Sequence, residues 1–266
     1  MPTLVLSPRY SSDSIILRRA AVAEGWNVFR LQGWRVPDEL RERNDDIALY
    51  GEALFAAAIA EALGRVLLEP PPDWLLSLPA PYLRRAVRST TLGAGREQGA
   101  PAFIKPADGK MFPARVYASG LELPLPEIVP DATAVLVSDP VDWGIEFRPF
   151  VLDGWVITFS PYLRRGQLAQ ADDGSWSAAP GEIEAALEFA ARVLGDPAVE
   201  LPPAVVLDVG IITERGWAVV EANAAWASGL YGCDPARVLP VLARACVPAD
   251  RLLDTDRRWM VERTGE

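Results

Sequence analysis

Two short apolar runs near the carboxyl-terminal end of the chain constrain its fold more than any other feature. Residues 204–207 and 217–220 are apolar, and the turn-prone segment Glu214-Arg215-Gly216 lies between them. Two apolar runs joined by a turn of this composition are typical of a β-hairpin. Antiparallel sheet is therefore expected in this part of the chain.

Oxygen-bearing side chains gather at one end of the predicted hairpin. Asp208 follows the first apolar run, and Glu221 and Asn223 follow the second. Residues two apart on a strand share a face, so Glu221 and Asn223 are expected to point the same way, with Asp208 alongside. Two carboxylates and one carboxamide suit Mg²⁺, which leaves its other positions to water and nucleotide phosphates. The alternative is that these side chains are solvated surface.

The composition limits the chemistry, because the 266 residues include no histidine. Histidine-activated nucleophiles and histidine-ligated zinc are excluded, whereas phosphoryl transfer can run on carboxylates, lysine, arginine and metal. A formal net charge of −10 argues against broad binding to nucleic acid or to an anionic membrane. No apolar run approaches a membrane span and no signal-peptide pattern is found, so a cytoplasmic location is expected. Cys233 and Cys246 lack metal-site spacing.

A proline run divides the chain. Three consecutive prolines, Pro70-Pro71-Pro72, cannot continue a helix or a central strand. We therefore predict a small α/β domain over residues 1–72 and a second domain over residues 73–266. The elements expected in the first domain are strands at 3–6, 27–31, 47–50 and 65–68 and helices at 12–24 and 51–63, a β-α-β beginning typical of a parallel sheet.

The second domain is expected to be mainly antiparallel β with flanking helices. Asp153-Gly154 is a strong signal for a two-residue hairpin turn. Strands are expected at 102–105, 114–117, 134–138, 145–152 and 155–160, helices at 182–194 and 236–245, and short helical segments at 73–78 and 81–87.

Two lysines flank a turn in the segment FIKPADGK, residues 103–110. Lys105 ends an apolar strand and Pro106 follows it, so its ammonium is expected at a defined position. Lys110 lies across the Ala-Asp-Gly turn. One lysine could contact the α- or β-phosphate of a nucleotide and Lys110 the γ-phosphate. The alternative for Lys105 is a solvated charge at a sheet edge.

Two further strands offer polar groups. Glu146 and Arg148 are two apart in EFRPFVLDG and share a face, where Arg148 could grip a phosphate or carboxylate with its planar fork. A structural salt bridge between them is the alternative. The segment LVSDP, residues 136–140, ends a strand in polar groups that could face an adenine edge, and an ordinary strand exit is the alternative there.

Taken together, these segments resemble the ATP-grasp superfamily, and especially small bacterial ATP-grasp proteins of uncharacterised substrate. The similarity is carried by FIKPADGK, EFR and VEANAAWASGLYG and covers about residues 75–245. The resemblance implies an ATP-grasp fold after a small α/β domain. A phosphate-contacting lysine that many members carry early in the domain is missing here. Its region offers only Arg84, Arg85, Arg88 and Arg96.

The resemblance also implies ATP and Mg²⁺ as cofactors and assigns roles to individual residues. Lys105 would contact the nucleotide, and Arg148 and Lys110 would act on the transferring phosphoryl group. Val137, Ser138, Asp139 and Glu146 would bind the nucleotide, and Asp208, Glu221 and Asn223 would hold Mg²⁺. Arg164, Arg165, Trp226 and Tyr231 are candidate pocket residues.

The implied activity is carboxylate–amine ligation, in which ATP phosphorylates a carboxylate and an amine attacks the acyl phosphate to give an amide. Small-molecule or peptide carboxylates and amines would be the partners, and neither nucleic acid nor membrane is expected. The oligomeric state is open, a homodimer included. The alternatives are a regulatory ATP-binding module without turnover and an unrelated α/β protein with an incidental acidic hairpin.

Overall fold

The computed structural model describes residues 1–43 and 45–260. It begins with a three-stranded parallel sheet in the order β2-β1-β3, formed by β1 (Thr3–Leu6), β2 (Asn27–Arg30) and β3 (Ile47–Tyr50). Helix α1 (Ser12–Ala23) connects the first two strands, and the side chains of Ser11 and Ser14 cap its first turn reciprocally. The predicted β-α-β beginning is confirmed.

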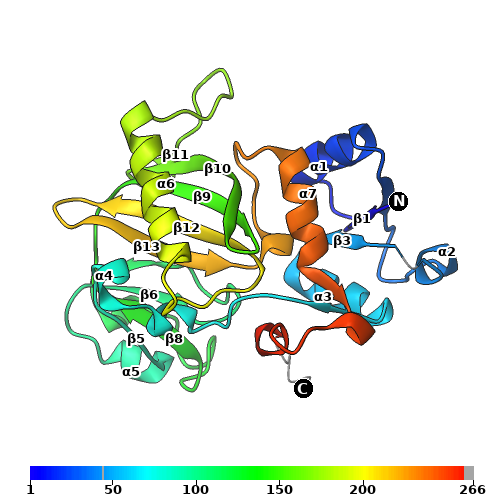
Figure 1. Ribbon diagram of the computed structural model, residues 1–266. Helices are drawn as coiled ribbons and strands as arrows, with labels where there is room; N and C mark the ends of the chain where they lie inside the picture. Colours follow the sequence, from blue (N-terminus) through cyan, green and yellow to red (C-terminus); the bar gives the residue numbers. More distant parts are fainter. Residues whose placement is uncertain (44, 261–266) are drawn as a thin grey trace.

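The carboxyl-terminal part of the chain returns to this sheet. Helix α7 (Pro235–Arg244) packs against α1 and β3, and β14 (Cys246–Pro248) pairs with β4 (Arg65–Leu67). Figure 1 shows α7 beside α1 and β3, on the side of the molecule that holds the amino terminus. The division at residue 72 stays a prediction. The other helices of this layer are α2 (Asp38–Arg41) and α3 (Ala53–Ala62).

A small antiparallel sheet follows in the order β5-β8-β6-β7. Its strands are β5 (Val87–Thr91), β6 (Ala102–Pro106), β7 (Arg115–Tyr117) and β8 (Ala134–Ser138). The prediction of a helical segment over 81–87 is wrong in its second half. Helix α4 (Ala80–Leu83) ends at Arg84, which has a left-handed φ of 49°, and β5 then pairs with β8. The short helix α5 (Leu92–Arg96) follows β5 directly.

A larger antiparallel sheet forms the centre of the molecule in the order β11-β10-β9-β12-β13. Its strands are β9 (Trp143–Leu152), β10 (Trp155–Arg164), β11 (Gln167–Leu168), β12 (Ala204–Ile212) and β13 (Gly216–Asn223). Both predicted hairpins are confirmed. Asp153 and Gly154 have φ values of 47° and 81°, as the tight turn between β9 and β10 requires.

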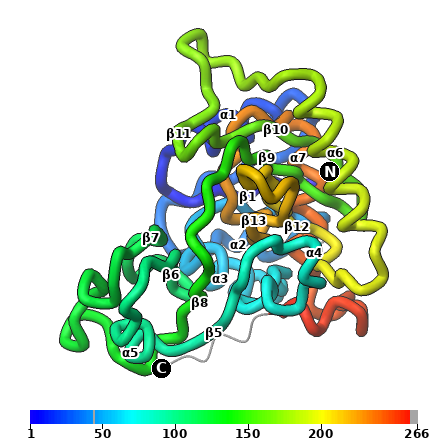
Figure 2. The backbone as a smooth tube through the Cα atoms, turned by 90° about the vertical axis from the view of Figure 1, so that its left-hand side faces the viewer, coloured from blue at the N-terminus to red at the C-terminus, as the bar shows by residue number. Residues whose placement is uncertain are grey.

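The two faces of the large sheet bury different partners. Phe147 and Leu207 belong to a core covered by helix α6 (Pro180–Leu194), whereas Phe150 and Val206 pack with α7 and the amino-terminal sheet. Figure 2 shows the small sheet set apart from the large one. The single-turn helices are η1 (Trp74–Ser77), η2 (Gly120–Glu122), η3 (Ala225–Ala227), η4 (Ala249–Arg251) and η5 (Arg257–Trp259).

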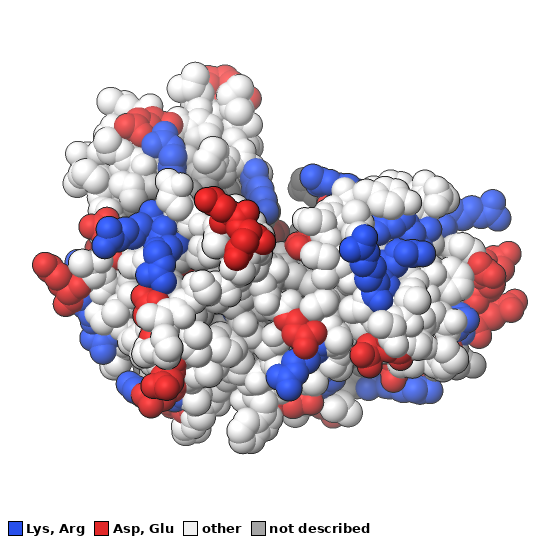
Figure 3. Space-filling view, turned by 90° about the horizontal axis from the view of Figure 1, so that it is seen from above, with Lys and Arg blue, Asp and Glu red and all other residues white. Residues whose placement is uncertain are grey.

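The predicted mixed α/β class with antiparallel sheets and flanking helices is confirmed. Among the described residues, no helix combines the length and apolar character needed to cross a membrane. Figure 3 shows basic and acidic side chains interspersed over one face, which is notched between two masses of the molecule.

Candidate active site between the two antiparallel sheets

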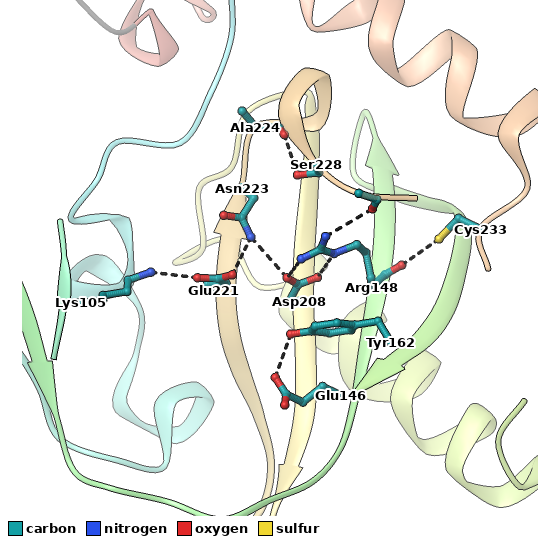
Figure 4. Close-up of polar contacts among 11 residues, drawn as sticks. Lys105, Glu146, Arg148, Tyr162, Asp208, Glu221, Asn223, Ala224, Ser228 and Cys233 are labelled. Atoms are coloured by element: carbon teal, nitrogen blue, oxygen red, sulfur yellow. Dashed lines mark hydrogen bonds and ion pairs between the residues drawn. The ribbon is translucent and has the colours of Figure 1, made fainter. Parts of the chain in front are cut away.

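A lateral row of polar side chains crosses the large sheet on the face turned away from α6. Ser160 of β10 is paired with Arg148 of β9, and Asp208 of β12 is paired with Glu221 of β13. Arg148 and Asp208 are joined by side-chain hydrogen bonds. Directly opposed residues on neighbouring strands lie within side-chain contact distance. The sheet register therefore lines up Arg148, Asp208 and Glu221, as Figure 4 shows.

The central contact of the row is a buried ion pair. Arg148 donates from Nε to Asp208 Oδ1 at 2.9 Å and from Nη2 to Asp208 Oδ2 at 2.6 Å. The guanidinium carbon also lies 4.8 Å and 4.9 Å from the ring centres of Tyr162 and Tyr231. Burial disfavours the charged guanidinium, but the neighbouring carboxylate outweighs it and raises the pKa of Arg148. Arg148 is therefore a fixed positive charge.

Asn223 links the ion pair to a second carboxylate. Its Nδ2 donates to Glu221 Oε1 at 2.9 Å and to Asp208 Oδ2 at 3.3 Å. Glu221 Oε2 in turn accepts a hydrogen bond from Lys105 Nζ at 2.9 Å. Burial works against the charged carboxylate, but Lys105 and Asn223 lower the pKa of Glu221 to about 2. Because Lys105 lies on β6 of the small sheet, this contact joins the two sheets across the site (Figure 4).

Glu146 lies one row away on the same face. Tyr162 donates its hydroxyl hydrogen to Glu146 Oε2 at 2.8 Å. Burial raises the pKa of Glu146 to about 7, even though the Tyr162 hydrogen bond favours the carboxylate. Glu146 also lines a cavity of about 530 Å³ together with Trp143 and Arg165. A Cβ added at Gly210 would come within 2.9 Å of the Trp143 ring and 3.1 Å of the Glu146 side chain, so glycine leaves them the space they occupy.

The predicted metal ligands have the chemistry that Mg²⁺ requires. Asp208, Glu221 and Asn223 converge through the Asn223 amide, and they offer two carboxylates and one amide oxygen. Within the described part of the chain, no group of three acidic, cysteine or histidine side chains forms a metal cluster. Lys105 and Arg148 now pair with the carboxylates. To hold a cation, Asn223 would turn its amide so that Oδ1 faces the carboxylates, and these residues fit the ion with that one rotation.

Several predicted residues lie outside this network. Lys110 is exposed beyond the end of β6. Val137 is buried on β8, next to Ser138. Asp139 follows β8, and its Oδ2 accepts a hydrogen bond from the backbone N–H of Ala86 at 3.0 Å. The alternative of a salt bridge between Glu146 and Arg148 is wrong, because each side chain bonds another residue.

The candidate pocket residues separate into different environments. Tyr231 lies against Arg148. Arg164 pairs with Glu182 on the surface. The prediction of Trp226 as a pocket residue is wrong, since it is 1% exposed and its indole N–H donates to the Leu68 carbonyl. The neighbouring apolar residues of VEANAAWASGLYG are core residues too, which the alternation of small apolar residues could have indicated.

The four arginines near the missing lysine also separate. Arg88 bonds Gln98 on the exposed face of the small sheet, and Arg96 pairs with Asp131. Arg84 and Arg85 reach strand β13 of the large sheet instead. Sequence reasoning missed Tyr162 as a site residue, because the predicted strand stopped at residue 160, whereas β10 continues to Arg164.

Comparison with known proteins gives a family match over most of the chain. A family model described as an ATP-grasp domain, family 2 of its clade, matches residues 82–241. No curated protein matches the chain.

Solved structures of the same fold cover nearly all of this chain. D-alanine–D-alanine ligase from Bacillus anthracis has a TM-score of 0.54 at 14% identity, covering 92% of this chain and 96% of its own. D-cycloserine synthetase DcsG has a TM-score of 0.56 at 15% identity, covering 91% and 99%. The ATP-grasp ligase PsnB, complexed with minimal precursor, Mg and ADP, has a TM-score of 0.52 at 15% identity, covering 91% and 97%. At such identities the likeness is one of fold.

Proposed function

The chain belongs to this family of ATP-grasp domains, and from this premise we propose that it is an ATP-dependent ligase that joins a carboxylate to an amine. ATP would phosphorylate the carboxylate, and the amine would displace phosphate from the acyl phosphate to form an amide. The products are the amide, ADP and phosphate. Structurally similar proteins named as ligases or synthetases support this class of reaction.

One observation carries the proposal: the continuous chain of contacts from Lys105 through Glu221, Asn223 and Asp208 to Arg148. It contains two cations and two anions, and it runs from the small sheet to the large one. A triphosphate needs positive charge, and a divalent cation needs carboxylates. Each charge is now neutralised by its opposite, and MgATP would supply new partners to both kinds of group.

The residues fall into three proposed groups. Lys105, with Val137, Ser138, Asp139 and Glu146, would bind the nucleotide, and the cavity beside Glu146 and Trp143 gives that part of the site its space. Asp208, Glu221 and Asn223 would hold Mg²⁺, which when bound neutralises phosphate charge. Lys110, exposed on the turn beyond β6, would reach the γ-phosphate.

Arg148 would stabilise the charge that develops during transfer. Its two bonds to Asp208, its bond from Nη1 to the Gly229 carbonyl at 3.3 Å and the two tyrosine rings fix the plane of the guanidinium. A charge that is already oriented needs no reorganisation when the reaction occurs. The protein supplies no nucleophile in this scheme, and it positions the reactants and keeps water away.

A coupled assay of ADP release tests this function. Purified protein with ATP and Mg²⁺ is screened against amino acids, dipeptides and peptide or protein acceptors, each as carboxylate donor and as amine. ADP should form only when a productive pair is present. The variant Glu221→Gln should lose this turnover, while the matched surface variant Glu182→Gln, which alters only a pair with Arg164, should keep it.

Two results would contradict the proposal. Release of AMP in the productive reaction would indicate adenylation of the carboxylate instead of phosphorylation. Tight Mg²⁺-dependent binding of ATP without turnover on any pair would favour the second candidate, a regulatory module of the same fold. The intact set of Asp208, Glu221, Asn223 and Lys105 counts against that candidate, because a protein that only binds ATP does not need it.

A further inference from the structure

Arg85 holds the edge strand of the large sheet at the point where that strand is irregular. Its Nη1 donates to the carbonyls of Leu83 at 3.1 Å and Val219 at 2.8 Å, and its Nη2 donates to the Val220 carbonyl at 2.9 Å. Its guanidinium also stacks on the Trp143 ring at 5.1 Å. One half-buried side chain therefore takes two successive carbonyls of β13, which has no strand beyond it to bind them.

The carbonyls that Arg85 binds belong to a β-bulge. Along the β12–β13 ladder Asp208 is opposite Glu221, but the next residue, Val209, is opposite Val219. Val220 is the extra residue. A bulge locally turns the strand and redirects the side chains beside it. The residue directly after this bulge is Glu221, so the bulge helps to set where the Glu221 carboxylate points.

Arg85 also lies at the junction between the two sheets. The chain passes into the small sheet at Ala86 and leaves it at Asp139, and these two residues bond each other through two contacts. The Asp139 N–H donates to the Ala86 carbonyl at 3.1 Å, and the Ala86 N–H donates to the Asp139 side chain at 3.0 Å. The two crossings therefore form one hinge, and Arg85 attaches that hinge to β13.

We propose that Arg85 is a positioning residue, which holds the bulge of β13 so that Glu221 meets Lys105 across the two sheets and can take part in MgATP binding. The second half of this statement rests on the proposed function. Glu221 is then held from two sides, by the Lys105 ammonium directly and by Arg85 through the backbone.

Zero-length cross-linking with a carbodiimide reads this geometry without any ligand. In the wild-type protein the Lys105 ammonium and the Glu221 carboxylate are 2.9 Å apart, so an amide cross-link between them should form and be found by peptide mass analysis. Arg85→Gln should lower its yield several-fold. Arg84→Gln is the matched control, because Arg84 bonds the Trp217 carbonyl of the same strand without touching the bulge, and it should give the wild-type yield.

Calorimetry of ATP binding with and without Mg²⁺ supplies the second readout. Partners that orient metal ligands change metal affinity by about 10–100-fold, and a loss in that range is expected for Arg85→Gln but not for Arg84→Gln. Arg85→Lys keeps the charge and can reach one carbonyl, so it should fold if the glutamine variant does not, and should restore part of both the cross-link and the affinity.

The outcomes separate the two proposals. Wild-type cross-link yield and wild-type affinity in Arg85→Gln would overturn the positioning role. An equal loss in Arg84→Gln would also overturn it, since any contact to the edge strand would then serve. Failure of the wild-type protein to bind MgATP would contradict the proposed function, while the cross-link would still decide whether Arg85 positions Glu221.

Discussion

Replacing Asp208 by asparagine should show how much the protein depends on the ion pair at the centre of its site. Asp208 is fully buried and Arg148 is 7% exposed. Asparagine keeps one acceptor oxygen but puts an NH₂ group against the guanidinium, so Arg148 stays buried and charged without a counter-ion. Removing one partner of a buried ion pair costs about 3–5 kcal/mol.

The environment of Arg148 places the expected cost at the lower end of that range. The Gly229 carbonyl and the rings of Tyr162 and Tyr231 still face the guanidinium in the variant. They are present before and after the change, so they limit the penalty without cancelling it. We expect Asp208→Asn to lower the free energy of unfolding by about 3 kcal/mol, which a domain of ordinary stability survives.

Urea denaturation followed by tryptophan fluorescence measures this free energy. The double variant Asp208→Asn/Arg148→Met removes the stranded charge, so it should be less destabilised than the sum of the two single variants. Glu182→Gln, which breaks an exposed pair with Arg164, should change stability by less than about 1 kcal/mol. A loss of under about 1 kcal/mol in Asp208→Asn, or strict additivity in the double variant, would refute the reasoning.

Three further predictions concern the polar face of the site. Lys105→Ala should lose ATP affinity in calorimetry with little change in melting temperature, and unchanged affinity would mean that Lys105 is only an edge charge. Arg148→Lys keeps the charge but loses the planar fork, so kcat and kcat/KM should fall by similar factors, whereas a rise in KM alone would indicate ground-state binding. Because burial raises the pKa of Glu146 from 4.5 to about 7, the folded protein binds this proton more tightly than the unfolded chain does. Stability should therefore fall as pH rises between these values, by about 3 kcal/mol at most. Glu146→Gln should remove that decline in denaturation at pH 5 and pH 8, and an unaltered pH profile would show that Glu146 is ordinarily acidic.

Local sequence patterns were enough to locate the centre of the site. The period of two along a strand placed Glu221 and Asn223 on one face, and the hairpin brought Asp208 to them. It also placed Glu146 and Arg148 together. Their partners could not be predicted in the same way, since Tyr162 and Asp208 reach them from other strands. The roles of all these residues remain predictions.

Strands that depend on long-range pairing were missed. Strand β5 reads Val-Arg-Ser-Thr-Thr, largely exposed and without apolar alternation, and it is a strand because β8 pairs with it. Strand β14 is three residues long and is formed by pairing with β4, far earlier in the chain. Arg85 was named as a substitute for a phosphate-binding lysine, but its contacts with backbone carbonyls become visible only once the hairpin is packed against the hinge.

The return of α7 and β14 to the amino-terminal sheet has a consequence for how the chain matures during synthesis. Leu4 and Leu17 share a core with Leu239 and Leu242, so residues translated first are covered by residues translated near the end. Until α7 emerges from the ribosome, one face of the parallel sheet has no cover, and non-local contacts of this kind form slowly. The first strands to be made are thus among the last to be finished, and the nascent protein is most exposed to misassembly or chaperone capture in that interval.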